Sequence, residues 1–151
     1  MGDPVTSSNP VLVDPGPDRI RVAVLLQDRS PHDAFLDWTE PERLQRWWPP
    51  RARIEARAGG VYEFDWPKMN WHLRGRIEQL VPDQLIGFSW CWDHEPGVTK
   101  HVIVRFTHEA AGTLVTVEHG SYTKAPRDLE LRQEHVDGWM HFLARLSTQK
   151  T

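Results

Sequence analysis

The hydrophobic pattern near the C-terminus is that of an amphipathic helix. Between Asp128 and about Thr148, apolar residues return at the 100° spacing of an α-helix, and charged residues fill the opposite face. Asp128 follows Pro126 and is a suitable N-cap. The stretch therefore predicts one long helix that covers the rest of the fold with its apolar positions, which are Leu129, Val136, Trp139, Met140, Leu143 and Leu146.

The chain before this helix alternates with the period of two that is typical of β-strands. The first strand is predicted from Arg19 to Gln27, and two short helices follow it, because Ser30-Pro31 and Thr39 before Pro41 are helix start signals. Gly59 and Gly60 mark a hairpin turn between later strands, which are predicted over 51–57, 61–66, 70–81, 85–92, 98–108 and 113–120. An antiparallel sheet must hide one face, and the long helix can cover it. The pattern predicts an α+β fold in which a curved antiparallel sheet of six to seven strands wraps around the C-terminal helix.

Composition narrows the class of protein. Residues 1–18 are rich in proline and glycine without periodicity, so we expect a flexible leader and one domain over 19–150. The net charge is −3 with scattered basic residues, so no nucleic-acid partner is expected. The single cysteine, Cys91, cannot form an internal disulfide, and no apolar run reaches the ~20 residues of a membrane span. We expect a cytoplasmic protein without a membrane partner.

Eight tryptophans against two tyrosines are the unusual feature of the composition. Each indole can bury ~150–250 Å², and its N–H needs a partner when buried. Inward-facing rings either fill a solid core or line a pocket, and we favour a pocket because rings of this size leave gaps between them. The candidate ligand-binding residues from this argument are Trp48, Tyr62, Phe64, Trp66, Trp71, Phe88, Trp90, Trp139 and Leu143.

Two polar residues join these candidates. His119 ends the last inward-facing row of the predicted sheet, where it is either a structural group or a polar contact for a ligand carbonyl or hydroxyl. Arg132 interrupts the apolar side of the predicted helix. It either neutralises a ligand carboxylate or lies with its stem on apolar surface and its head in water. Gly138 costs a helix about 1 kcal/mol relative to alanine, so we expect it to mark close packing or a local loosening.

Motifs for metal or covalent chemistry are missing from the sequence. His135 and His141 are not at the spacing of helical metal ligands, and Cys91 has no cysteine partner. No nucleophile elbow and no phosphate loop can be recognised. We therefore assign no metal, no cofactor and no catalytic residue.

Five segments taken in order resemble a known family. They are AFLDWTEPERLQRWWPP from Ala34, AGGVYEFDW from Ala58, GRIEQLVPDQLIGFSW from Gly75, GTLVTVEHGSY from Gly112 and EHVDGWMHFLARL from Glu134. Across about residues 20 to 148 they resemble the family related to the C-terminal domain of the activator of the heat-shock protein 90 ATPase, within the START-like (SRPBCC) helix-grip superfamily. The resemblance implies a hydrophobic cavity between helix and sheet, a histidine at the position of His119, and an unassigned ligand in most small members.

Three functions remain open at this point. We expect a domain that binds a small hydrophobic or aromatic molecule without chemistry. The superfamily also contains polyketide cyclases, so a second hypothesis is a cyclase- or dehydratase-type enzyme with His119 as general acid or base on a polyketide-like substrate. A third is a co-chaperone-like interaction module. The eukaryotic co-chaperone engages the chaperone through an additional N-terminal domain for which this chain has no room, so we do not expect chaperone contact. A homodimer stays an open option.

Overall fold

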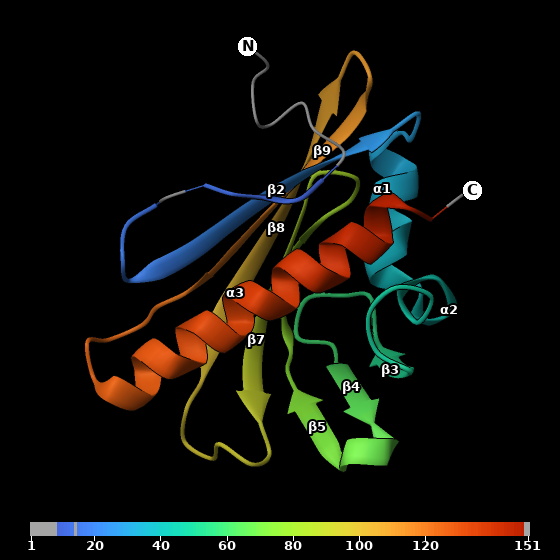
Figure 1. Cartoon of the computed structure of the whole chain (residues 1–151). Helices are drawn as coiled ribbons and strands as arrows, with labels where there is room; N and C mark the ends of the chain where they lie inside the picture. Colours follow the sequence, from blue (N-terminus) through green and yellow to red (C-terminus); the bar gives the residue numbers. More distant parts are fainter. Residues whose placement is uncertain (1–8, 14, 150–151) are drawn as a thin grey trace.

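A long helix lies against one face of a curved antiparallel sheet (Figure 1). The helix is α3 (Pro126–Ser147), and the computed structural model describes residues 9–13 and 15–149. Over these residues the sheet has nine strands in the order β1-β2-β9-β8-β7-β5-β4-β3, with β6 paired to β7. The predicted α+β helix-grip architecture is confirmed.

The bounds of the elements follow the predicted order closely. The helices before α3 are α1 (Pro31–Thr39), α2 (Pro41–Leu44) and the 3-10 turn η2 (Pro67–Met69). The strands are β1 (Val11–Leu12), β2 (Arg19–Gln27), β3 (Arg51–Ile54), β4 (Tyr62–Trp66), β5 (Trp71–Arg74), β6 (Ile77–Val81), β7 (Leu85–Trp92), β8 (Lys100–Glu109) and β9 (Gly112–Gly120).

The sheet has more strands than the six to seven predicted. The stretch 70–81 forms two strands, β5 and β6, which pair with opposite ends of β7. Gly75 lies at the break, where a Cβ atom would come within 2.2 Å of the carbonyl oxygen of Ser89 in β7, so the backbones approach too closely for any other residue. Strand β1 (Val11–Leu12) lies within the expected flexible leader and pairs with β2. This part of the leader is therefore a strand of the sheet. Residues 1–8, 14 and 150 of the predicted segments lie outside the described residues.

The helix starts agree with the sequence signals in one case and differ in two. Ser30 caps α1 as predicted, accepting a hydrogen bond from the backbone N–H of Asp33 at 3.1 Å. Glu40 rather than Thr39 precedes α2, because the Thr39 hydroxyl donates to the Phe35 carbonyl inside α1. Helix α2 spans only Pro41–Leu44 and ends before Trp47 and Trp48.

Helix α3 begins at Pro126, and Asp128 lies in its first turn instead of capping it. The Asp128 carboxylate accepts hydrogen bonds from the Lys100 ammonium at 3.0 Å and from the Thr123 backbone N–H at 2.7 Å. Lys100 is buried and belongs to β8, so this pair ties the start of α3 to the sheet. None of the described helices combines the length and apolar character needed to cross a membrane.

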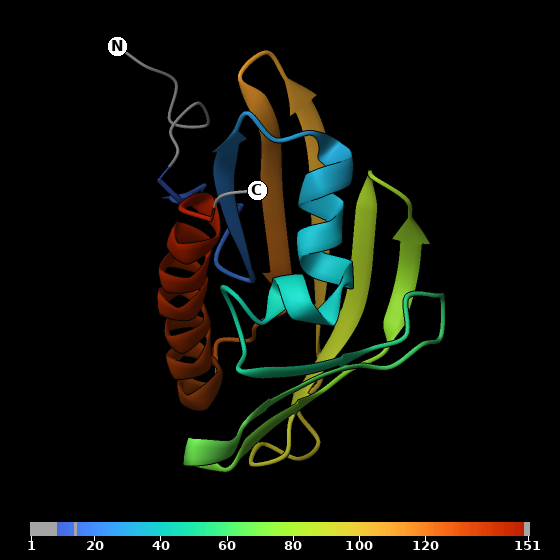
Figure 2. The same ribbon diagram turned by 90° about the vertical axis from the view of Figure 1, so that its right-hand side faces the viewer.

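The buried face of α3 is offset from the predicted one at its start. Leu129 is 49% exposed, whereas Leu131 is buried. The buried residues Leu131, His135 and Trp139 recur every four positions and so follow one side of the helix. Helices α1 and α2 lie near the C-terminal end of α3, and the hairpin of β4 and β5 extends below α2 (Figure 1 and Figure 2).

Two histidines and a tryptophan hold the middle of α3 on the sheet. The indole N–H of Trp139 donates to Nδ1 of His119 in β9 at 3.0 Å, and both side chains are buried. The ring of His119 stacks on that of His135, with 4.6 Å between the centroids. An indole N–H can only donate, so Nδ1 of His119 is unprotonated and the ring is neutral when this hydrogen bond is present.

The two imidazoles resist protonation in the folded protein. Burial lowers the pKa of His119 well below its ordinary value, and the neighbouring His135 lowers it further. Burial also lowers the pKa of His135, to about 3, and the charges of Lys100 and Arg127 act in the same direction. In the unfolded chain both groups take up a proton near pH 6.5. Their contribution to stability is therefore fully present above that pH and is lost as the pH falls from about 6.5 toward 3.

We predict that the free energy of unfolding decreases as the pH is lowered below 6.5. Each neutral buried histidine contributes about 1.4 kcal/mol per pH unit to this loss, or about 2 kcal/mol per histidine between pH 6.5 and 5. Urea unfolding at pH 7.5, 6.0 and 5.0 measures it, and the His135→Asn variant should show a shallower dependence on pH. His141→Gln, on the exposed side of the same helix, controls for the loss of an imidazole. Equal slopes in His135→Asn and the parent protein would contradict the assignment.

Candidate functional site

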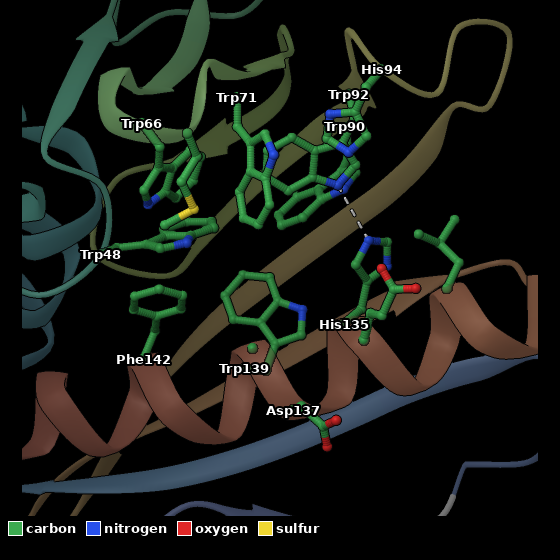
Figure 3. A pocket seen from close by; sticks show the side chains of 14 residues that line it. Trp48, Trp66, Trp71, Trp90, Trp92, His94, His135, Asp137, Trp139 and Phe142 are labelled. Atoms are coloured by element: carbon green, nitrogen blue, oxygen red, sulfur yellow. Dashed lines mark hydrogen bonds between the residues drawn. The ribbon is translucent and has the colours of Figure 1, made fainter.

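A pocket of about 420 Å³ opens between the middle of α3 and the strands opposite it (Figure 3). Six of the eight tryptophans of the chain line it. The lining residues come from the segment after α2, from the β4–η2–β5 hairpin, from the end of β7 and from α3. They are Trp48, Trp66, Met69, Trp71, Trp90, Trp92, His94, Leu131, Glu134, His135, Asp137, Gly138, Trp139 and Phe142.

The pocket has a buried inner end and an exposed outer edge. Figure 3 shows Trp139 and Phe142 rising from α3 toward rings that come from the strands opposite. At the inner end, the buried rings of Trp48 and Trp90 lie 4.9 Å and 5.7 Å from that of Trp139. At the outer edge, Trp71 is 43% exposed and Met69 is 53% exposed. Large apolar side chains therefore border both the interior and the solvent side of the pocket.

The β4–β5 hairpin brings two of the tryptophans together. Trp66 ends β4 and Trp71 begins β5, and they are direct partners in the strand register. The chain reverses between them through η2, which ends at Asn70 in the left-handed conformation with φ 55°. Asparagine tolerates this conformation better than most residues. Trp92 of β7 contacts both partners, with ring centroids 5.4 Å and 6.1 Å away.

Both ring nitrogens of His135, on the α3 side of the pocket, have hydrogen-bond partners. The indole N–H of Trp92 meets Nε2 of His135 at 3.4 Å, and Nδ1 lies 2.7 Å from the hydroxyl of Tyr122. Because the indole can only donate, Nε2 is unprotonated, and Nδ1–H donates to the Tyr122 oxygen. Burial raises the pKa of Tyr122 and lowers that of His135 to about 3, so both groups are neutral near pH 7.

Two carboxylates lie at the pocket. Glu134 and Asp137 both border it, and among the described residues that line it there is no lysine or arginine. Glu134 accepts a hydrogen bond from Arg127 at 2.8 Å. Asp137 accepts one from Gln133 at 2.9 Å and points away from the indole rings (Figure 3).

The structure brings five of the eleven candidate residues to the pocket and places the other six elsewhere. Those at the pocket are Trp48, Trp66, Trp71, Trp90 and Trp139. Tyr62, Phe64, Phe88 and Leu143 are fully buried core residues, and the Tyr62 hydroxyl donates to the Trp38 carbonyl in α1 at 2.7 Å. They point inward as predicted, but other side chains cover them. Whether any of the eleven binds a ligand stays a prediction.

The two polar candidates do not line the pocket. His119 lies beneath α3, where its Nδ1 accepts a hydrogen bond from the indole N–H of Trp139. An indole only donates this hydrogen bond and is not an acid–base partner for the imidazole. This arrangement gives no support to His119 as a general acid or base on a bound substrate. The guanidinium of Arg132 donates to the backbone carbonyl of Arg19 at 2.8 Å. Arg132 is one residue after Leu131, about 100° further around the helix, so it faces β2 and not the pocket.

Sequence reasoning missed several lining residues on α3. Leu131 and His135 precede Trp139 by eight and four positions, a spacing that places all three on one side of a helix. Gly138 also borders the pocket, and a Cβ atom there would meet nothing within 4 Å. Of the two alternatives expected for Gly138, close packing or a local loosening, close packing is wrong, since the missing side chain leaves open space. Over the described residues, no group of three or more His, Cys, Asp or Glu could hold a metal ion.

Solved structures with the same fold come from several bacteria. Protein MLL2253 of Mesorhizobium loti has 15% identity and a TM-score of 0.76, covering 85% of this chain and 93% of that one. CalU16 of Micromonospora echinospora has 20% identity and a TM-score of 0.66, covering 93% and 81%. DynU16, a protein of the dynemicin biosynthetic locus, has 20% identity and a TM-score of 0.73, covering 86% of this chain and 46% of that one. At these identities the likeness shows a shared fold.

Family membership comes from the sequence itself. Comparison with curated proteins finds no significant match. The model of the family described as Activator of Hsp90 ATPase homolog 1-like protein matches residues 28–149, from the end of β2 through the whole of α3. This range includes every residue that lines the pocket. The chain therefore belongs to the Activator of Hsp90 ATPase homolog 1-like family.

Proposed function

We propose that this protein binds a small hydrophobic molecule with an aromatic body in the tryptophan-lined pocket, without catalysing a reaction on it. The observation that carries the proposal is the set of six indoles around a space of about 420 Å³ that opens to solvent. Small-molecule sites are commonly concave and mostly apolar, with a few placed polar groups. Here His135 and Glu134 are the polar groups on one side of the space.

The exposed rings at the outer edge support the same function. Burying apolar surface contributes about 25 cal/mol per Å². A ligand that covers the exposed parts of Trp71 and Met69 therefore gains binding free energy. A flat ligand can also stack on the indoles, which adds about 0.5–1.5 kcal/mol for each aromatic pair. DynU16, which shares the fold, comes from the dynemicin biosynthetic locus. We place the binding function in the cytoplasm, where a chain with the single cysteine Cys91 is stable without disulfides.

The alternatives have weaker support from the geometry. The enzyme hypothesis depended on His119, which instead holds Trp139 in place. The interaction-module hypothesis has no specific observation in its favour. A homodimer stays a prediction.

We predict that Trp71→Ala weakens binding of a neutral hydrophobic probe such as Nile red about fivefold, because one stacked ring is lost. Fluorescence titration of the dye measures the dissociation constant, and native mass spectrometry of the purified protein tests for a co-purified ligand. Val81→Ala is the matched control, since Val81 is also 43% exposed but does not line the pocket. Failure of the parent protein to bind the dye and to carry any small molecule would overturn the proposed function.

Gly138 offers a test that removes no wall residue. We predict that Gly138→Leu fills the pocket and abolishes dye binding, because its side chain projects into the open space beside Trp139. Gly138→Ala should instead raise the free energy of unfolding by about 0.5–1 kcal/mol through helix propensity. Gln133→Leu adds the same apolar side chain at an exposed position of α3 outside the pocket and should leave dye binding intact. Undiminished dye binding by a folded Gly138→Leu protein would show that the dye binds elsewhere.

A further inference from the structure

We propose that the preferred ligand is an organic cation, an aromatic or alicyclic body that carries an ammonium group at the outer edge of the pocket. The inference rests on the proposed function and names the chemical class of the ligand. Two features of the pocket carry it: the faces of its rings and the negative charge at its edge.

Aromatic faces attract positive charge through the ring quadrupole. The attraction acts within about 6 Å of a ring centroid and is strongest for tryptophan. Trp92 has Trp66 at 5.4 Å and Trp71 at 6.1 Å between ring centroids, and all three line the pocket. The three indoles lie close together, with the ring of His94 packed against Trp71 and Trp92, so an ammonium group at this edge has more than one indole nearby. Carboxylates gain nothing comparable from these faces.

The open hydrogen-bonding group on the α3 side is the carboxylate of Glu134. Both ring nitrogens of His135 already have partners, because Nε2 meets the Trp92 N–H and Nδ1 meets the Tyr122 hydroxyl. The carboxylate of Glu134 attracts a cation and repels a ligand carboxylate. At the inner end, the buried indole N–H of Trp90 has no partner among the described residues, so the donor there is a neutral one.

The surrounding charge has the same sign. Glu95, Glu130 and Glu134 all contact the single guanidinium of Arg127, so this cluster keeps an excess of negative charge. The positive end of the α3 dipole does not reverse this, because its effect falls off within the first turn, where Asp128 already pairs with Lys100.

Positive side chains that could receive an anion are directed elsewhere. Arg132, the residue considered for a ligand carboxylate, binds the Arg19 carbonyl. Arg74 pairs with Asp93 on the outer side of β5. Asp137 points away from the rings and adds negative charge only at a distance (Figure 3).

The test compares three probes that share a naphthalene body and differ in charge. They are 2-naphthylmethyl-trimethylammonium, 2-naphthylmethanol and 2-naphthoate, titrated by calorimetry at low ionic strength. We expect the cation to bind about fivefold to thirtyfold more tightly than the alcohol, and the carboxylate to bind most weakly. The preference for the cation should shrink in about 0.5 M salt, since exposed charges are screened.

Two variants locate the effect. Glu134→Gln should reduce the preference for the cation over the alcohol about threefold, because it removes the carboxylate that borders the pocket. Glu130→Gln removes a charge from the same Arg127 cluster outside the pocket and should change the preference by less than about twofold.

The outcomes separate the two proposals. Equal affinity for the three probes, or tightest binding of the carboxylate, overturns the cation inference and leaves the proposed binding function standing. If none of the three binds, the proposed function fails and the cation inference fails with it. Equal losses in Glu134→Gln and Glu130→Gln would show that a diffuse field, and not the pocket edge, attracts the cation.

Discussion

Helix α3 is held at its middle by a hydrogen bond between two buried side chains, the indole of Trp139 and the imidazole of His119. Such a bond is strong in a low-dielectric interior, but it forms only while the imidazole is neutral. It fixes the orientation of Trp139, whose ring stacks against Trp38 on one side at 6.0 Å and borders the pocket on the other. The same residue thus separates the solid core from the open space.

This division explains how the fold can tolerate a pocket. Leu143 and Leu146, toward the C-terminal end of α3, are completely buried, and Trp38 and Trp47 close the core beneath α1 and α2. Stability comes mainly from that well-packed end, where large side chains leave few gaps. The N-terminal half of α3 is tied down by the Lys100–Asp128 pair at its start. Between these two attachments the helix can stand away from the strands without unfolding.

Periodicity alone predicts most of this fold but only part of the site. It finds α3, the order of the strands and the Ser30 cap of α1, because these depend on the spacing and identity of neighbouring residues. It separates inward-facing from outward-facing positions of a strand. It cannot tell which of the inward-facing side chains are covered by other core residues and which border the pocket. Phe88 and Trp90 lie on the same side of β7, but only Trp90 reaches the pocket. The role of His135 depends on partners in β7 and before α3, which no local pattern brings together.

The absence of a side chain at Gly138 makes the free volume of the pocket depend on a single position. A side chain introduced there enters open space, while the indole walls and their hydrogen bonds keep their places. Most residues also have a higher helix propensity than glycine, which offsets part of the free-energy cost of a substitution. The volume of the pocket can therefore change through one codon, independently of the framework around it.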